Sequence, residues 1–269
     1  MSKRFVLLGA GKMATALGKA LAQSGLLPWD EILAIDPSEA ARAAFTQTTG
    51  LEALPLEQTG EALAQTEYLL LAVKPQVAEA AVAALPTLKK SPLILSICAG
   101  IPLAKLSQWL GTRRIIRIMP NTPLMVGQGA SCYAPDADAT ESDIAFADAL
   151  LGNAGLARRV TEDQMDAVTA LSGSGPAYFF EMAQALALAG ETVGLSPELA
   201  LDLTIQTMRG SAEMLAQKLG TPDALRDAVT SPNGTTYAGL QVMKSAGFRK
   251  CMQETVQAAR DRSVELGRG

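Results

Sequence analysis

From Lys3 to about Val160, short continuous apolar runs alternate with stretches in which apolar residues recur at helical spacing. The runs are rich in Leu, Ile and Val, which is typical of strands buried on both faces of a sheet. We predict strands over residues 4–9, 31–36, 67–73, 92–97, 113–118, 129–134 and 156–160, and helices over 12–24, 38–46, 57–65, 75–85 and 102–110. This alternation indicates a doubly wound parallel α/β sheet with helices on both faces.

The pattern changes after Thr161, where the strand-like runs stop and helical patterns rich in Ala, Leu and Met begin. Thr161 and Gln164 have the spacing of a capping box, and Ser196-Pro197 and Thr221-Pro222 each place a capping hydroxyl before a helix-starting proline. The predicted helices cover 162–171, 176–193, 197–219, 222–230, 235–246 and 248–266. We therefore predict an α/β domain over residues 1–161 and an all-α domain over residues 162–269.

The predicted helix 176–193 is apolar almost all the way round. Phe179, Phe180, Met182, Leu186 and Leu188 do not gather on one face. A helix of this kind must be enclosed by protein, and the remaining helices of the second half are too few to enclose it. The sequence therefore predicts at least a homodimer.

Charge and composition exclude several classes of protein. The net charge is -4 and the basic residues are scattered, so we expect no nucleic-acid partner and no membrane-surface role. Apolar stretches of spanning length and a secretory signal are both lacking, and Cys98, Cys132 and Cys251 are far apart in the chain. These features predict a cytoplasmic protein with reduced thiols.

The sequence contains no histidine. Imidazole therefore cannot serve here as a general base, a member of a catalytic triad or a metal ligand. We expect no metal site, and any chemistry must come from a cofactor or from Lys, Tyr, Ser, Thr, Asp or Glu.

A glycine-rich segment lies between the first predicted strand and the first predicted helix. Gly9 allows the tight turn, Gly11 lets a pyrophosphate approach the backbone, and Ala14 is small enough for the helix to pack on the strand. The N–H groups of Lys12 and Met13 open the helix, where the helix dipole favours phosphate. This Rossmann-like arrangement predicts binding of NADPH or NADH.

Asp36 ends the second predicted strand, and two interpretations of it stand side by side. A carboxylate here is placed to accept hydrogen bonds from the adenosine ribose, which favours NADH and repels a 2′-phosphate. Alternatively, Asp36 is the N-cap of the helix that follows Pro37.

Further cofactor contacts are expected where two later strands end. Residues Ala72, Val73, Lys74 and Pro75 end one strand, and Ala99 and Gly100 follow another. Small, flat groups at these ends would let a nicotinamide ring lie against the backbone. Lys74 is either catalytic, structural or phosphate-facing, and Cys98 is interpreted as a packed small side chain.

Several segments taken together resemble the pyrroline-5-carboxylate reductase family. They are GAGKMATAL at 9–17, AVKPQ at 72–76, RIMPNTP at 117–123, LSGSGPAY at 171–178 and DAVTSPNGTTYAGL at 227–240. The resemblance runs along nearly the whole chain in the right order. It implies a homodimer with interlocked helical domains, 1-pyrroline-5-carboxylate as substrate, a cofactor contact at Asn121 and a substrate contact at Gly175.

The family's substrate loop, which binds the substrate carboxylate, matches this chain at Ser231, Gly234, Thr235 and Thr236. The chain departs from the family at Asn233, where glycine is usual, although asparagine tolerates positive φ better than most residues. The residues themselves agree with this role, because a Pro-Asn-Gly turn before a helix leaves N–H groups unpaired beside several hydroxyls. The alternative is an ordinary helix-capping loop.

The reaction that the resemblance implies is hydride transfer to the C=N carbon of a cyclic imine, giving L-proline. An iminium already carries its proton, so the lack of histidine is no obstacle. Thr236 is the residue we expect to hydrogen-bond the ring nitrogen. Two alternatives are a β-hydroxyacid dehydrogenase, which would need a lysine that helix 176–193 lacks, and a non-catalytic nucleotide sensor, which needs no carboxylate-binding loop.

Overall fold

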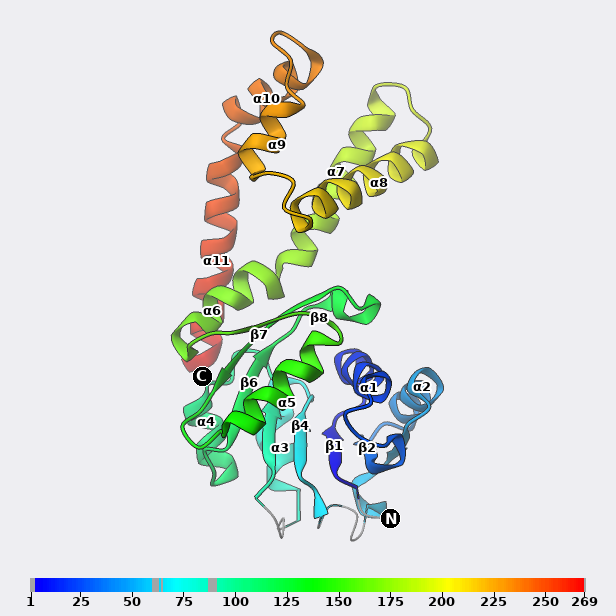
Figure 1. Ribbon diagram of the computed structural model, residues 1–269, viewed down its shortest axis with the longest axis vertical. Helices are drawn as coiled ribbons and strands as arrows, with labels where there is room; N and C mark the ends of the chain where they lie inside the picture. The colour runs from blue at the N-terminus through cyan, green and yellow to red at the C-terminus, as the bar shows by residue number, and fades with distance from the viewer. Residues whose placement is uncertain (1–2, 60–62, 64, 87–90, 269) are drawn as a thin grey trace. The chain divides into compact units, whose positions relative to one another are not determined.

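The computed structural model describes residues 3–59, 63, 65–86 and 91–268 of the chain (Figure 1). Its residues form two compact units, Met1–Ser174 together with Ala259–Gly269, and Gly175–Ala258. The chain therefore passes from the first unit to the second and returns at its end. Among the described helices, none is long and apolar enough to cross a membrane.

The first unit is built on one sheet. Within the described residues, eight strands pair in the order β3-β2-β1-β4-β5-β6-β7-β8. They are β1 (Phe5–Leu8), β2 (Ile32–Ile35), β3 (Glu52–Leu54), β4 (Tyr68–Leu71), β5 (Leu93–Ser96), β6 (Ile115–Met119), β7 (Gly129–Pro135) and β8 (Gly155–Arg159). The order runs outward in both directions from β1 and β4, which is the doubly wound arrangement that the sequence predicts.

The sheet is mixed where the sequence predicts a parallel one. All neighbouring strands are parallel except β6 and β7, which run antiparallel. Only the 3-10 helix η4 (Thr122–Val126) and its flanking residues separate these two strands. A parallel crossover needs a dozen or more residues, so this short connection returns the chain in the opposite direction.

Helices cover both faces of the sheet (Figure 1). On one face, α1 (Lys12–Ser24), α2 (Glu39–Thr49) and α5 (Glu141–Gly152) contribute buried residues such as Leu17, Phe45 and Leu150. On the other face, α3 (Pro75–Ala83) and α4 (Leu103–Leu110) contribute Ala78 and Leu106. Because both faces are buried, the strands are continuously apolar, which is the feature that made them recognisable.

Two elements of the first unit differ from the prediction, because the sequence pattern indicates no strand over 52–54 and no helix over 141–152. β3 has three residues, too few for a recognisable run. α5 begins with Thr140 and Asp143 in a capping box. The predicted helix 57–65 falls partly on residues outside the described part of the chain, and Leu56–Gln58 form a 3-10 turn.

The second unit is helical. It holds α7 (Gly175–Thr192), α8 (Pro197–Ala216), α9 (Pro222–Ala228), α10 (Thr235–Ser245) and the first half of α11 (Phe248–Arg268). Ser196 and Thr221 cap α8 and α9 as predicted, by accepting the N–H groups of Leu199 and Ala224. Phe179 and Phe180 on α7 are 60% and 68% exposed, so the single chain does not enclose this apolar helix.

The segment that leads to the second unit is more broken than the predicted helix 162–171. It comprises a 3-10 turn over Glu162–Gln164, α6 (Met165–Val168) and a π-helix, η6 (Thr169–Gly173). The capping box of Thr161 and Gln164 is confirmed. π-helical turns are rare and occur often at functional sites.

Candidate active site

The glycine loop after β1 is held tightly between the ends of two neighbouring strands. Gly9 donates its N–H to the carbonyl of Ile35 at 2.7 Å, and Ala72 donates to the carbonyl of Leu8 at 2.9 Å. Gly9 has a φ of +108°, and a Cβ there would lie 2.7 Å from the carbonyl oxygen of Ala72. Only glycine therefore fits this position.

Gly11 has the opposite surroundings. It is the N-cap of α1, no side chain caps that helix, and a Cβ on Gly11 would meet nothing within 4 Å. A hollow of about 380 Å³ opens here, lined by Gly11, Lys12, Thr15, Ala41 and Met125 among others. Unpaired N–H groups facing open space fit the pyrophosphate of a dinucleotide.

Asp36 uses both carboxylate oxygens within the protein. Oδ2 accepts the N–H of Ala10 at 2.9 Å and Oδ1 accepts the N–H of Ser38 at 2.8 Å. The N-cap of α2 is Ser38, so the capping role proposed for Asp36 falls to its neighbour. Asp36 instead ties the glycine loop to the turn after β2, over which Arg42 also lies, donating to the carbonyls of Asp36 and Pro37.

The loops after β4 and β5 meet at the same edge of the sheet. The thiol of Cys98 lies 3.5 Å from the carbonyl of Val73, and burial raises its pKa although a hydrogen bond from Ser96 opposes this. Cys98 is therefore a packed neutral side chain. Pro75 opens α3, whose N-cap is Lys74, and no side chain caps that helix.

Asn121 follows β6 and is buried. Its Oδ1 accepts the N–H of Ala130 at 2.9 Å, and its Nδ2 donates to the carbonyl of Ser172 at 3.1 Å. The side chain thus joins the start of β7 to the π-helix η6.

The candidate substrate loop lies in the second unit, directly before α10. Asn233 has a φ of 57°, the left-handed conformation that asparagine tolerates better than most residues. Gly234 is the N-cap of α10 and makes no side-chain cap, and a Cβ on it would collide with the Ser231 hydroxyl. The described hydrogen bonds include none from the hydroxyls of Thr235 and Thr236, so the loop offers polar groups to a ligand.

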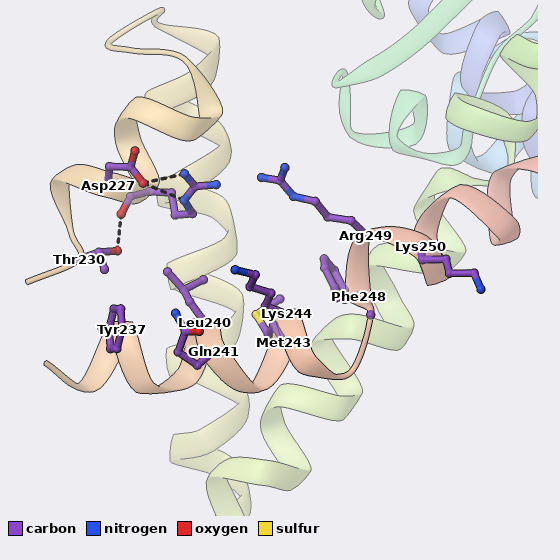
Figure 2. Close-up of a pocket in the computed structure, with 12 residues that line it drawn as sticks. Asp227, Thr230, Tyr237, Leu240, Gln241, Met243, Lys244, Phe248, Arg249 and Lys250 are labelled. Atoms are coloured by element: carbon purple, nitrogen blue, oxygen red, sulfur yellow. Dashed lines mark hydrogen bonds and ion pairs between the residues drawn. The ribbon is translucent and has the colours of Figure 1, made fainter. Parts of the chain in front are cut away.

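A hollow of about 660 Å³ adjoins this loop within the second unit (Figure 2). Thr230 and Tyr237 line it on the loop side, and Lys244, Phe248 and Arg249 line it from α10 and α11. Arg226 is occupied by ion pairs with Asp223 and Asp227. The loop's own N–H and hydroxyl groups remain as further polar groups beside the hollow.

Comparison with known proteins identifies the relatives of both units. The family model described as pyrroline-5-carboxylate reductase dimerisation matches residues 162–266, and the one described as NADP oxidoreductase coenzyme F420-dependent matches residues 4–100. Pyrroline-5-carboxylate reductase of Pseudomonas aeruginosa is 42% identical, over 98% of this chain and 96% of its own. The chain belongs to the pyrroline-5-carboxylate reductase family.

Solved structures of pyrroline-5-carboxylate reductases agree with this assignment. The Plasmodium falciparum enzyme with NADP bound superposes with a TM-score of 0.87 at 29% identity, covering 98% of each chain. The Coxiella burnetii enzyme superposes with a TM-score of 0.87 at 30% identity, covering 99% of each chain. The dimerisation model begins at residue 162, whereas the compact units divide at Ser174.

Some residues of the candidate site carry no recognisable motif. Thr15 and Ala41 line the hollow at Gly11, and Met125 reaches it from η4. Arg42 lies over the turn after β2 through its position on α2. A helical repeat of three or four residues from Lys12 would have indicated Thr15, whereas the contribution of η4 depends on the tertiary fold.

Two glycine substitutions should separate fold from cofactor binding. Gly9→Ala should lower the melting temperature by several degrees and abolish cofactor binding, because the methyl group collides with Ala72. Gly11→Ala should keep the melting temperature and weaken NADPH binding at least about tenfold, since its methyl group occupies the space of a phosphate. Calorimetric titration and thermal unfolding measure both. Unchanged NADPH affinity in Gly11→Ala would contradict the assigned pyrophosphate position.

Proposed function

We propose that this protein reduces 1-pyrroline-5-carboxylate to L-proline with NAD(P)H, the last step of proline biosynthesis. The observation that carries the proposal is 42% identity to a curated pyrroline-5-carboxylate reductase over 98% of the chain. The open N–H groups of the glycine loop support cofactor binding. The polar groups of the loop before α10 support substrate binding.

On the nucleotide side, the first turn of α1 holds the pyrophosphate through the N–H groups near Gly11, Lys12 and Met13. Ala14, which is buried, lets α1 pack closely on the sheet. The segments Ala72–Pro75 and Ala99–Gly100 receive the nicotinamide side, and Asn121 holds the adjoining loop. When bound, NAD(P)H supplies the hydride.

On the substrate side, the Ser231 hydroxyl and the N–H groups of Thr235 and Thr236 donate hydrogen bonds to the carboxylate, while the N–H of Gly234 closes the turn on the carbonyl of Ser231. The two donating N–H groups open α10, whose dipole favours a negative charge at this end. Thr236 hydrogen-bonds the ring nitrogen, and Gly175, the first residue of α7, allows close approach of backbone. The loop orients the substrate without bringing a charged side chain into contact with it.

Reduction of the imine requires little acid–base catalysis by the protein. The iminium form of the substrate carries its proton on nitrogen, so hydride addition at the C=N carbon yields a neutral amine. No alkoxide forms, and the chain contains no histidine to protonate one. Orientation of two reactants, which can supply several kcal/mol of the barrier, is the main contribution of the protein.

The turn after β2 favours NADPH over NADH. Each oxygen of Asp36 accepts one backbone N–H group, which holds this carboxylate against the glycine loop and the turn. The Arg42 guanidinium lies over the same turn and donates to the carbonyls of Asp36 and Pro37. A guanidinium at this place attracts a 2′-phosphate and offers it hydrogen-bond donors.

The protein acts as a homodimer whose helical units interlock. The dimerisation family model covers residues 162–266. In the single chain, Phe179 and Phe180 on α7 and Leu199 and Leu203 on α8 are exposed. An apolar surface of this extent marks a protein interface.

The substrate loop is tested by a pair of alanine variants. Thr236→Ala should lower kcat with 1-pyrroline-5-carboxylate about 2- to 13-fold, because a neutral hydrogen bond contributes about 0.5–1.5 kcal/mol. NADPH binding and the melting temperature should stay the same. Proline formation by the wild type and both variants is the measurement, with Thr235→Ala as the less affected control. Full activity in both variants would place the substrate elsewhere.

The cofactor preference is tested at Arg42. Arg42→Ala should lower kcat/KM for NADPH about tenfold and leave kcat/KM for NADH nearly unchanged, since only NADPH carries the 2′-phosphate. Steady-state kinetics with each cofactor gives the ratio. An equal loss with both cofactors would mean that Arg42 only stabilises the turn.

The assembly is tested by light scattering. The purified protein should have a mass of at least twice the 28.1 kDa of the chain. Leu188→Glu, which places a charge on the exposed apolar face of α7, should shift it toward monomer and lower activity. A wild-type monomer that is folded and active would refute the dimer.

A further inference from the structure

Helix α11 belongs to both compact units. It runs from Phe248 to Arg268 without interruption, and its residues from Ala259 onward belong to the unit that contains the sheet. At 1.5 Å per residue, a helix of this length spans about 30 Å. The chain therefore returns to the nucleotide-binding unit through a continuous helix rather than through a loop.

The returning end of α11 is fastened by a hydrogen bond between segments far apart in the sequence. The Ser263 hydroxyl donates to Oδ1 of Asp166 on α6 at 2.7 Å, across 97 residues. Ser263 is 4% exposed. A buried hydroxyl without a partner is costly, so this bond determines how the end of α11 seats on α6.

Beyond this bond, α11 touches the loop between β5 and α4. Leu266 Cβ lies 3.4 Å from the point where a Cβ of Gly100 would stand. A Cβ on Gly267 would lie 3.2 Å from the carbonyl oxygen of Gly100. Gly100 is buried and has a φ of +75°, so this loop is closely packed against the end of α11.

The other end of the same loop is held from the segment that carries Asp166. Oε1 of Glu162 accepts the N–H of Leu103, the first residue of α4, at 3.0 Å. The same oxygen accepts Nη1 of the buried Arg117 at 2.6 Å. Glu162 and Asp166, four residues apart, thus anchor both flanks of the loop.

We propose that the end of α11 is a clasp that positions the Ala99–Gly100 loop for the nicotinamide, with Ser263 as the positioning residue that keeps it seated. Its catalytic consequence rests on the proposed function, whereas its structural part concerns this chain alone. Without the Ser263 bond, the last turns of α11 fray as helix ends do when untied, and Gly100 loses its packing. The glycine loop and the substrate loop are unaffected.

Hydrogen–deuterium exchange on the cofactor-free protein tests the clasp. Ser263→Ala should speed exchange in residues 97–103 and 259–268 about tenfold, and leave residues 5–17 unchanged. Asp166→Asn keeps an acceptor for the hydroxyl and should remain near the wild type. Thr255→Val is the matched control, because the bond described for the Thr255 hydroxyl is to the carbonyl of Cys251 within α11 itself.

Kinetics then separate positioning from general loss of structure. In Ser263→Ala, kcat should fall about tenfold while KM for NADPH changes less than about twofold. The isotope effect with cofactor deuterated at the transferred position should rise, because hydride transfer becomes more rate-limiting. Asp166→Asn should retain most of the activity.

Unchanged exchange at residues 97–103 in Ser263→Ala would overturn the clasp. The clasp would also be overturned by faster exchange throughout the first unit together with an unchanged isotope effect. That result would indicate that Ser263 contributes to stability only. The exchange experiment requires no turnover, so failure of the clasp and failure of the proposed function are distinguishable.

Discussion

The close approach of Gly9 to the end of β4 is the constraint on which the nucleotide site depends. Because Gly9 has no Cβ, the loop after β1 can lie directly against the carbonyl of Ala72. Gly9 then bonds the carbonyl of Ile35 at the end of β2, and Leu8 accepts the N–H of Ala72 after β4. In this arrangement a Cβ on Gly11, at the start of α1, would meet nothing within 4 Å, and the N–H of Ala10 bonds the carboxylate of Asp36. The glycine loop, the turn after β2 and the loop after β4 thus form one structure, and a change at Gly9 disturbs all of them.

The main demand that the proposed reaction makes on the protein is to orient its two reactants. The glycine loop lies in the first unit and the loop before α10 lies in the second, and the chain joins the two units at two places. One connection passes through the π-helix η6, where Asn121 bonds the carbonyl of Ser172. The other is α11, fastened by Ser263.

Elements with many continuous apolar residues, or with capping hydroxyls and prolines, could be predicted from the sequence. β4 and the start of α8 are examples, because burial on both faces and local capping leave marks that need no tertiary context. β3 could not, since three residues on an edge carry little pattern. The reversal at β7 follows from a short connection, and the seating of α11 on α6 joins residues 97 positions apart. For Asp36, the structure rules out the capping interpretation because Ser38 is the N-cap of α2, and it shows a link between the glycine loop and the turn after β2 that the sequence did not indicate.

The most direct test of the account is to follow the hydride itself. The protein, supplied with 1-pyrroline-5-carboxylate and a cofactor deuterated at the transferred position, should give proline with one deuterium on the carbon that was double-bonded to nitrogen. Nuclear magnetic resonance and mass spectrometry locate that label. Proline labelled elsewhere, or no labelled proline while the cofactor is oxidised, would contradict hydride transfer to the imine.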